Sequence, residues 1–275
     1  MGILNVTPDS FYDGGKYNVL DKAIMHIEEM IEDGADIIDI GGESTRPGSV
    51  PVETEEEIKR VIPVIDLAIK KIKKISNGEV IISIDTYKSD VAKAAIDKGA
   101  LIVNDISGLR FDKNMIDVVA KSNVSVIIMH MKGTPQNMQN NPTYDNVVIE
   151  IKNYFQERIS YLSSKGILKD NIILDPGIGF GKTVKHNLQI LSQIKEFHTF
   201  GLPILLGTSR KSFIGKILGS ESNPLKPEER LEGSIATYIW AVLNGIKILR
   251  VHDVKETKRA LKVIESIMDV NYGIN

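Results

Sequence analysis

Eight short runs of mostly apolar, often β-branched residues constrain the fold of this chain more than any other feature. Continuous runs of this length suit strands that are buried on both faces, as in parallel sheets. The runs cover residues 2–5, 36–40, 80–85, 101–105, 125–130, 171–175, 203–207 and 247–252. Nearly all of them end in a polar or charged residue. In parallel strands these residues meet on one rim, which is where a (β/α)8 barrel carries its chemistry.

The stretches between the runs have the apolar spacing of helices. Such stripes cover residues 20–31, 58–72 and 260–268. Pro63 lies inside the second stripe, where we expect a kink or a broken helix start. A strand and a helix repeated eight times is the order that a parallel barrel needs. We therefore predict an α/β fold, a single (β/α)8 TIM barrel over residues 1–275. A doubly wound open sheet is the alternative, although it usually has fewer strands and one ligand-binding switch point.

The length of 275 residues would allow two domains on a crude estimate, but α/β barrels of about 250 residues are commonly single domains. No linker or low-complexity tract divides the chain, and a hydrophobic content of 42% suits one large core. The net charge is −2, and the one dense lysine cluster, at residues 70–74, ends a predicted helix. The sequence therefore does not support nucleic-acid binding.

The chain contains no cysteine, which excludes disulfides, thiol catalysis and thiolate metal sites. Its longest apolar runs have the length of strands, so the sequence shows no signal peptide or membrane span. We therefore expect a cytoplasmic protein with no membrane partner.

The glycine-rich segment 175–183 is close to a nucleotide-binding loop but does not match one. A P-loop requires glycine where this chain has Pro176, and the dinucleotide motif requires glycine where it has Lys182. The glycines are better explained by a sharp turn after a strand and a close approach of the backbone to a ligand. Asp175 would then lie at the strand end, over the barrel mouth.

The segments that follow the last two runs favour an anion site. Residues 207–215 combine hydroxyl groups, cations and the start of a predicted helix. Arg250 and His252 are two positions apart, so their side chains point the same way in a strand. Barrels often bind phosphate beside their seventh and eighth strands. These features suggest phosphate or pyrophosphate; the alternative is a surface charge cluster.

Three strand ends carry acceptors in the middle of the barrel order: Asp85, Asn104 and Asp175. Each alone would more often be a cap or a core hydrogen bond, but buried acceptors need donors. Together they suit a flat, nitrogen-rich heterocycle with donors along one side. Long loops at 7–15 and 41–48 follow the first two strands, and we predict that they close over the site as lids. His130 ends a strand but receives no predicted role.

This set of segments resembles the dihydropteroate synthase family. The matching segments are residues 1–11, 38–48, 83–87, 103–108, 129–131, 174–182, 207–212, 229–234 and 250–256. The resemblance implies a transferase of folate biosynthesis. It would join 6-hydroxymethyl-7,8-dihydropterin pyrophosphate to p-aminobenzoate, giving 7,8-dihydropteroate and pyrophosphate, with Mg²⁺ as cofactor. Sulfonamide inhibition and a homodimer are further family properties.

The resemblance also implies residue roles. The implied pterin contacts are Asp85, Asn104, Ile106, Met129, Asp175, Lys211 and Arg250. The implied p-aminobenzoate contacts are Phe11, Thr45, Arg46, Pro47, Phe180, Lys211 and Ser212. Pyrophosphate would be bound by Asn5, Arg250 and His252, with Asn5 also a metal ligand. The implied catalytic residues are Lys211, Arg250, His252, Asp85 and Asp13.

Two alternatives remain at this point: a pterin-dependent methyltransferase barrel and a non-catalytic pterin-binding barrel. The methyltransferase has no use for a pyrophosphate or benzoate site, so Lys211 and Ser212 with residues 44–47 argue against it. One departure concerns the start of the chain, because family members usually carry a short β segment before Met1. The domain could lack that segment, or be excised from a fusion with a pterin pyrophosphokinase. The small-residue segment 233–241 could pack against a partner or against its own barrel.

Overall fold

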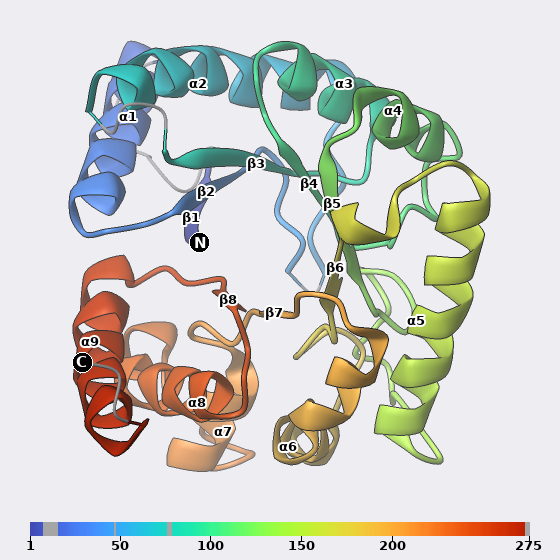
Figure 1. Ribbon diagram of the computed structural model, residues 1–275, viewed down its shortest axis with the longest axis vertical. Helices are drawn as coiled ribbons and strands as arrows, with labels where there is room; N and C mark the ends of the chain where they lie inside the picture. Colours follow the sequence, from blue (N-terminus) through green and yellow to red (C-terminus); the bar gives the residue numbers. More distant parts are fainter. Residues whose placement is uncertain (8–15, 47, 76–78, 273–275) are drawn as a thin grey trace.

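The computed structural model describes residues 1–7, 16–46, 48–75 and 79–272, and in these residues eight parallel strands alternate with helices in a (β/α)8 barrel (Figure 1). The strands are β1 (Gly2–Asn5), β2 (Ile37–Gly41), β3 (Ile81–Asp85), β4 (Ile102–Asp105), β5 (Ser125–Met129), β6 (Ile172–Asp175), β7 (Leu205–Leu206) and β8 (Ile248–Leu249). No strand extends more than one residue beyond its predicted run. Strands β7 and β8 lie inside their runs and are much shorter than predicted.

Two isolated bridges close the barrel. Strands β1 to β6 form one parallel sheet in sequence order, and β7 pairs with β8. The bridge between Leu174 and Ile204 joins β6 to the start of β7, and the bridge between Gly2 and Val251 joins β1 to the end of β8. The backbone amide of Ile3 also donates to the Val251 carbonyl at 3.0 Å. The ring of strands therefore has no free edge, which excludes the open doubly wound sheet.

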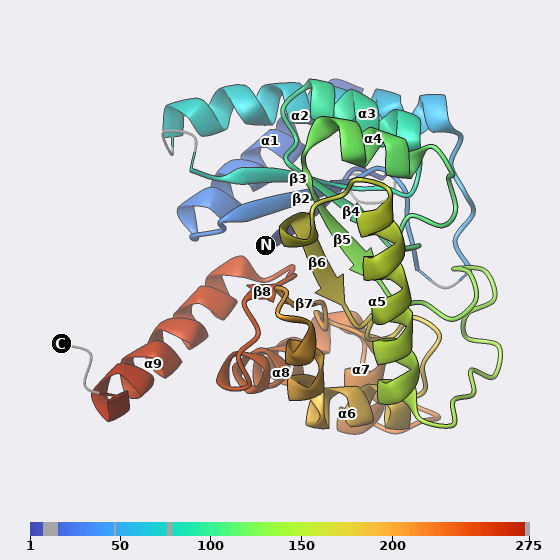
Figure 2. The same ribbon diagram turned by 45° about the vertical axis from the view of Figure 1, so that its right-hand side comes forward.

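Helices surround the ring of strands (Figures 1 and 2). They are α1 (Lys16–Glu32), α2 (Thr54–Ile75), α3 (Ser89–Asp97), α4 (Met115–Ser122), α5 (Val147–Ser164), α6 (Val184–Ser192), α7 (Ser212–Leu218), α8 (Leu231–Leu243) and α9 (Val254–Tyr272). Helix α2 runs unbroken across Pro63, so the expected broken start is wrong. Burial of Val61 before the proline and of Val64 after it holds both halves against the barrel. The described part of the chain contains no helix long and apolar enough to cross a membrane.

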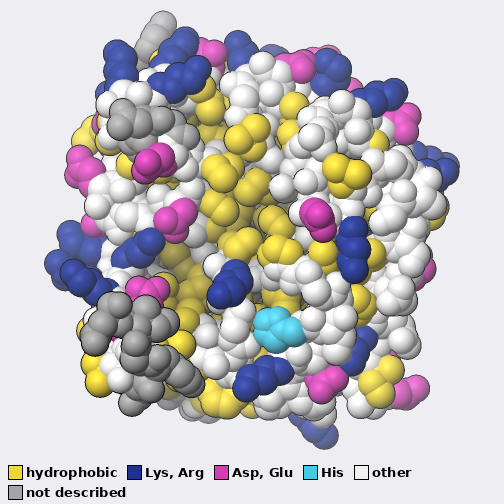
Figure 3. Space-filling view, in the orientation of Figure 1, with side chains coloured by type: hydrophobic (Ala, Val, Ile, Leu, Met, Phe, Trp, Pro, Cys, Tyr) yellow, Lys and Arg dark blue, Asp and Glu magenta, His cyan; other side chains and the backbone are white. Residues whose placement is uncertain are grey.

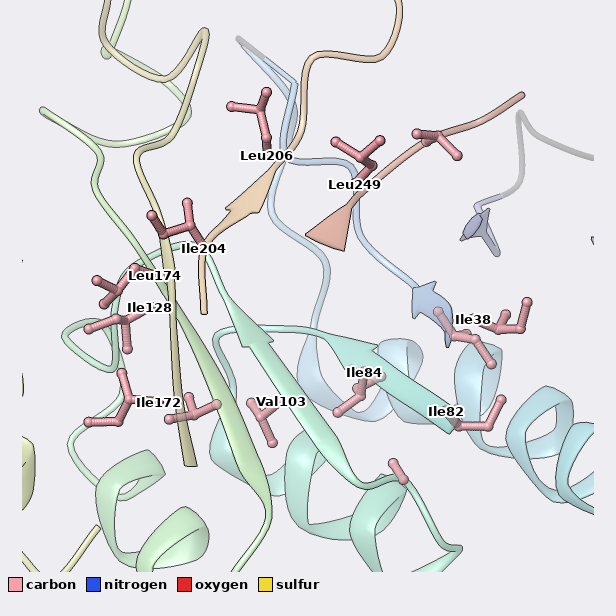
Figure 4. Close-up of a cluster of buried hydrophobic side chains, with 14 of the residues drawn as sticks. Ile38, Ile82, Ile84, Val103, Ile128, Ile172, Leu174, Ile204, Leu206 and Leu249 are labelled. Atoms are coloured by element: carbon pink, nitrogen blue, oxygen red, sulfur yellow. The ribbon is translucent and has the colours of Figure 1, made fainter. Parts of the chain in front are cut away.

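Successive side chains along each strand point alternately outward, toward the helices, and inward, into the barrel. Residues such as Ile82, Ile84, Val103 and Leu174 belong to the large cluster between strands and helices (Figure 4). Their neighbours in sequence therefore point into the barrel. At the amino ends of the strands the interior is apolar. The cluster there comprises Met1, Ile102, Ile127, Ile173 and Leu205, with Ile37, Ile81 and Ile248 packed against it.

Four interior-facing polar residues, Asn5, Asp85, Asn104 and Asp175, lie at or next to the carboxyl ends of their strands, and this places the candidate site at that mouth. Figure 3, in the orientation of Figure 1, shows apolar side chains gathered around the centre of one face, with Lys and Arg mostly toward its edge.

The small-residue face of α8 packs against its own barrel. Ser234 and Ala241 are fully buried, and a Cβ atom on Gly233 would lie 2.3 Å from Ile214 of α7. The Thr237 hydroxyl forms a 2.6 Å hydrogen bond with Thr208, which follows β7. These contacts use the small side chains within the protomer.

Candidate active site

Strand register brings the inward-facing residues at the carboxyl ends into one row. Asn5 pairs with Gly41, Gly41 with Asp85, and Asp85 with Asn104. Strand β5 is offset from this row, since Asn104 pairs with Ile127; Met129, two residues farther along β5, pairs with Asp175 of β6. Because all these strands are parallel and closed into a ring, residues from opposite ends of the chain line the same mouth.

Arg250 connects two carboxylates across this mouth. Its Nε donates to Oδ2 of Asp39 and its Nη2 to Oδ2 of Asp85, both at 2.6 Å. The Asn104 side-chain amide donates to the same Asp39 oxygen at 3.0 Å. The predicted residues Asp85, Asn104 and Arg250 therefore lie together, in contact with Asp39, to which the sequence analysis assigned no role.

Asp175 and Lys211 form the other side of the mouth. Asp175 accepts a 2.7 Å hydrogen bond from the backbone amide of Gly177, at the sharp turn predicted after this strand. Gly177 has a φ of +68°, and a Cβ atom there would lie 2.0 Å from the His130 carbonyl oxygen, so only glycine fits. The Lys211 ammonium donates to the Ile178 carbonyl and lies 4.5 Å from the centre of the Phe180 ring. Lys211 thus places a cation over an aromatic face, where its charge also acts on the Asp175 carboxyl.

An apolar cluster lies beside these polar groups. It contains the predicted residues Ile106 and Met129, both buried, together with Met131 and Met138. Tyr87 and Phe180 pack against it from the rim. A flat ring that hydrogen-bonds through one edge could rest its faces on such side chains, because methionine adapts to irregular shapes.

Burial perturbs the ionisable groups of the mouth. It raises the pKa of the Asp85 carboxyl to about 7, although Arg250 acts in the opposite direction and Asp39 reinforces the rise. It also raises the pKa of Asp175, against the effect of Lys211. It lowers the pKa of Lys211 to about 8, with Asp175 opposing. Burial and opposing charges in one cleft are typical of functional sites.

The predicted anion site is more neutral than expected. Ser209 accepts from the His252 backbone amide at 3.1 Å, and its hydroxyl lies 2.9 Å from the His252 ring nitrogen Nδ1. Burial, reinforced by Arg250, lowers the pKa of His252 to about 4, so this ring is neutral at pH 7. Arg210 is paired with Asp253, its Nε lying 3.0 Å from the carboxylate. At the predicted anion site His252 is therefore neutral, and Arg210 and Arg250 are both paired with carboxylates.

Asn5 is half-buried at the end of β1, and within the described part of the chain no hydrogen bond of its side chain is found. Its amide oxygen is a hard donor of the type that Mg²⁺ prefers. The described residues contain no group of three or more acidic, histidine or cysteine side chains placed to hold a metal. A single amide fits an ion that keeps most of its waters and shares phosphate oxygens with a substrate.

The two predicted lids are only partly described. Phe11 and Asp13 in the first loop, and Pro47 in the second, lie outside the described residues. Thr45 is half-buried and Arg46 exposed, and Gly48 donates a backbone hydrogen bond of 3.1 Å to Pro135 in the loop after β5. The second loop therefore reaches across toward the loop that follows β5. Ser212 is exposed as the first residue of α7.

A buried ion-pair network anchors the base of the second loop. Lys88 donates to Glu43 at 2.6 Å and also pairs with Glu57 on α2. Tyr87 donates to Glu43 at 2.7 Å. No local sequence pattern predicts this network, because its members lie on three different elements.

A contact between two more buried groups, Lys182 and His130, was not predicted from the sequence. The Lys182 ammonium lies 3.1 Å from Nδ1 of His130 and donates to the carbonyls of His130 and Phe180. Burial lowers the pKa of His130 to about 2 and that of Lys182 well below its usual range. Their contacts hold the loop that carries Phe180. The sequence around Lys182 indicates only an incomplete nucleotide-binding motif.

Comparison with known proteins gives a consistent picture. A family model described as pterin binding enzyme matches residues 1–252. The chain is 47% identical over 268 residues to dihydropteroate synthase of Escherichia coli (strain K12), covering 98% of this chain and 91% of that protein. Among solved structures, Yersinia pestis dihydropteroate synthase with a sulfonamide drug has a TM-score of 0.89 and 43% identity, with 98% and 94% of the two chains covered. Xanthomonas albilineans dihydropteroate synthase in complex with 7,8-dihydropteroate has a TM-score of 0.84 and 40% identity, with 98% and 92% covered.

Proposed function

This chain belongs to the family of pterin-binding enzymes, and we propose that the residues gathered at its barrel mouth carry out the dihydropteroate synthase reaction. The chain is a transferase of folate biosynthesis. It condenses 6-hydroxymethyl-7,8-dihydropterin pyrophosphate with p-aminobenzoate to give 7,8-dihydropteroate and pyrophosphate. Because its similarity extends over 98% of the chain to dihydropteroate synthases, the methyltransferase alternative is set aside.

The observation that carries the proposal is the contact of Arg250 with two buried carboxylates beside Asn104. A dihydropterin has donors along one edge, and the acceptors of Asp85, Asn104 and Asp175 match such an edge. Ile106 and Met129 would contact its faces. Arg250 would lie over the ring and, with Asn5 and His252, bind the pyrophosphate.

The p-aminobenzoate side of the site begins at Lys211, which touches the ring of Phe180. Its ammonium would attract the benzoate carboxylate, and Ser212 and Thr45 would supply hydroxyl groups nearby. Arg46, with Phe11, Asp13 and Pro47 of the lid loops, would complete this pocket. Sulfonamides resemble p-aminobenzoate, and a sulfonamide complex is known for the relative from Yersinia pestis. We therefore expect these drugs to occupy the same pocket here.

In the reaction, the C–O bond to pyrophosphate breaks and a C–N bond to the arylamine forms, while the amine releases one proton. The electron-rich pterin delocalises positive charge that develops on its methylene carbon. Asp85 and Asp175 favour that charge, and the cations of Arg250 and Lys211 favour the departing anion. Binding both substrates in one pocket overcomes the weak nucleophilicity of an aromatic amine. A loop closed over the mouth would exclude water, which is the competing nucleophile.

Magnesium is the cofactor that we propose for this site. It would neutralise part of the pyrophosphate charge when bound. Asn5 is the one protein ligand that we assign to it, since its amide belongs to the row of residues at the mouth. His252, neutral at pH 7, would act beside it as a hydrogen-bond partner of the phosphate oxygens.

We also propose a homodimer and a cytoplasmic location. Four apolar side chains on α7 and α8 are about half exposed: Ile217, Leu218, Trp240 and Leu243. Such a group of exposed apolar residues suits an interface with a second copy. The absence of cysteine suits a reducing compartment. Sedimentation equilibrium would test the dimer.

The test of the proposed function is a condensation assay with the pterin pyrophosphate and p-aminobenzoate, with and without Mg²⁺. We expect dihydropteroate to form only with the metal. Binding of both substrates without product would instead support the non-catalytic alternative. Equal product after chelation would contradict the roles of Asn5 and the ion.

A further inference from the structure

Asp39 is a carboxylate that lies inside the barrel, below the row of residues at the mouth. It is fully buried on β2, and it pairs in register with Ser83 of β3. Its Oδ2 accepts from both Arg250, at 2.6 Å, and Asn104, at 3.0 Å. Its Oδ1 is also buried and has no hydrogen-bond partner among the described residues. All hydrogen bonds of its carboxylate to the described part of the protein therefore go to two residues assigned to pterin binding.

Contact with Asp39 determines which end of the Asn104 amide faces the substrate. An ionised carboxylate offers only acceptors, so only the NH₂ group of Asn104 can face it. The amide oxygen of Asn104 is thereby turned away from Asp39 and left to accept from a ligand. Without Asp39, the amide could rotate by half a turn and present its donor instead, which would oppose the donors of a pterin edge.

The same contact orients Arg250. Because Nε is held by Asp39, the guanidinium plane is fixed at two points when Nη2 also reaches Asp85. A planar group held in this way keeps one face and its remaining N–H donors in a constant direction. Asp39 thus acts on two pterin contacts that lie 146 residues apart along the chain, at positions 104 and 250.

We propose that Asp39 is a positioning residue for pterin recognition, which orients the acceptor of Asn104 and the plane of Arg250 without touching the reacting atoms. The proposal rests on the proposed pterin site. A purely structural role explains the arrangement less well, because a buried carboxylate with one unpartnered oxygen is costly. That cost is offset when the group creates a preorganised binding site.

Two nearly isosteric substitutions separate orientation from packing. In Asp39→Asn the side-chain oxygen can still accept from Arg250 and Asn104, while the new NH₂ occupies the place of the unpartnered oxygen. In Asp39→Leu both hydrogen bonds are lost. We expect Asp39→Leu to raise the KM for the pterin pyrophosphate by ~10- to 100-fold, with the KM for p-aminobenzoate within about twofold of wild type. Asp39→Asn should recover most of the loss.

A double-mutant cycle with Asn104→Ala tests the route of the effect. If Asp39 acts through Asn104, adding Asp39→Leu to the Asn104→Ala variant should raise the pterin KM by a clearly smaller factor than it does in wild type. Ser83→Ala is the matched control, because Ser83 is buried beside Asp39 and its hydroxyl has no partner among the described residues. It should leave both KM values unchanged. Thermal unfolding and circular dichroism identify any variant that fails to fold.

Equilibrium binding of unreactive 6-hydroxymethylpterin separates this proposal from the proposed reaction. If the wild-type chain binds this pterin but makes no dihydropteroate, the proposed reaction fails, and the dissociation constants of the variants still test Asp39. The positioning role is overturned if folded Asp39→Leu binds the pterin within about twofold of wild type. An equal rise in both KM values, an additive cycle, or a Ser83→Ala variant as impaired as Asp39→Leu would overturn it as well.

Discussion

Replacing Arg250 by methionine tests whether ion pairs hold the barrel mouth together. The guanidinium group lies 2.6 Å from each of two carboxylates, on Asp39 and Asp85, whose side chains are 0% and 9% exposed. Removing the guanidinium leaves these two buried carboxylates without their ion-pair partner. Breaking a buried pair by removing one partner typically costs about 3–5 kcal/mol. We expect Arg250→Met to lower the free energy of unfolding at pH 8 by about this amount.

The loss of unfolding free energy caused by Arg250→Met should depend on pH, because Asp85 titrates within the pH range in which unfolding can be measured. Burial raises the pKa of Asp85 from 3.8 to about 7. A carboxyl whose pKa is higher in the folded protein than in the unfolded chain destabilises the fold as pH rises. The penalty begins near pH 4, the unfolded value, and is complete above the folded value.

Removing Arg250 takes away the charge that holds this pKa down, so the penalty continues to grow above pH 7 in the variant. One pKa unit corresponds to about 1.4 kcal/mol. We therefore expect the substitution to cost at least about 1 kcal/mol more at pH 8 than at pH 5.

Urea denaturation followed by circular dichroism at pH 5, 7 and 8 measures this difference. Lys93→Met is the control, since it removes an exposed ion pair with Asp97 and should leave the unfolding midpoint close to wild type at each pH. Adding Asp85→Asn to Arg250→Met removes one stranded charge and should recover part of the lost stability. A loss smaller than about 1 kcal/mol that does not vary with pH would refute the reasoning.

The other predictions concern activity. Lys211→Ala should lower kcat/KM by ~100-fold or more while the protein remains folded, since it removes the cation that lies over the Phe180 ring and interacts electrostatically with Asp175. Lys216→Ala, five residues beyond Lys211 on α7, is the control, and near-normal turnover of Lys211→Ala would remove Lys211 from the site. Asn5→Ala should raise the Mg²⁺ concentration needed for half-maximal rate by ~10-fold, and an unchanged metal dependence would contradict its role as a ligand. A sulfonamide should raise the apparent KM for p-aminobenzoate without changing kcat, and inhibition that excess p-aminobenzoate does not relieve would place the drug elsewhere.

Polar residues at strand ends could be predicted from the sequence because parallel barrels place all such ends on one rim. Once the strand boundaries are known, the barrel fold itself brings Asp85, Asn104 and Asp175 together. The predicted runs were long enough to include β7 and β8, yet these strands keep only two residues each, Leu205–Leu206 and Ile248–Leu249. Apolar composition shows which residues are buried, but it does not show where ladder pairing stops.

Asp39 could not be assigned a role in this way, because its partner Arg250 is 211 positions away and no local pattern connects them. It interrupts an apolar strand instead of ending one, and in hindsight that interruption is the available signal. The contact of Lys182 with His130 was equally invisible, since it depends on how two neighbouring loops turn after their strands. The roles assigned to Phe11, Asp13 and Pro47 lie outside the described residues and stay predictions.

The charge balance of the mouth suits this chemistry because acidic side chains outnumber the basic ones among its assigned residues. Asp39, Asp85 and Asp175 lie near the two cations Arg250 and Lys211, so these five side chains together carry a net negative charge when all three carboxyls are ionised. A negative excess favours a reaction in which positive charge develops on the pterin. Burial raises the pKa of Asp85 and of Asp175, so this excess diminishes as the pH falls below about 7. We therefore expect activity to decline as the pH falls below about 7, where the Asp85 carboxyl takes up a proton, and a pH profile of kcat/KM that stays level down to pH 5 would contradict this reasoning.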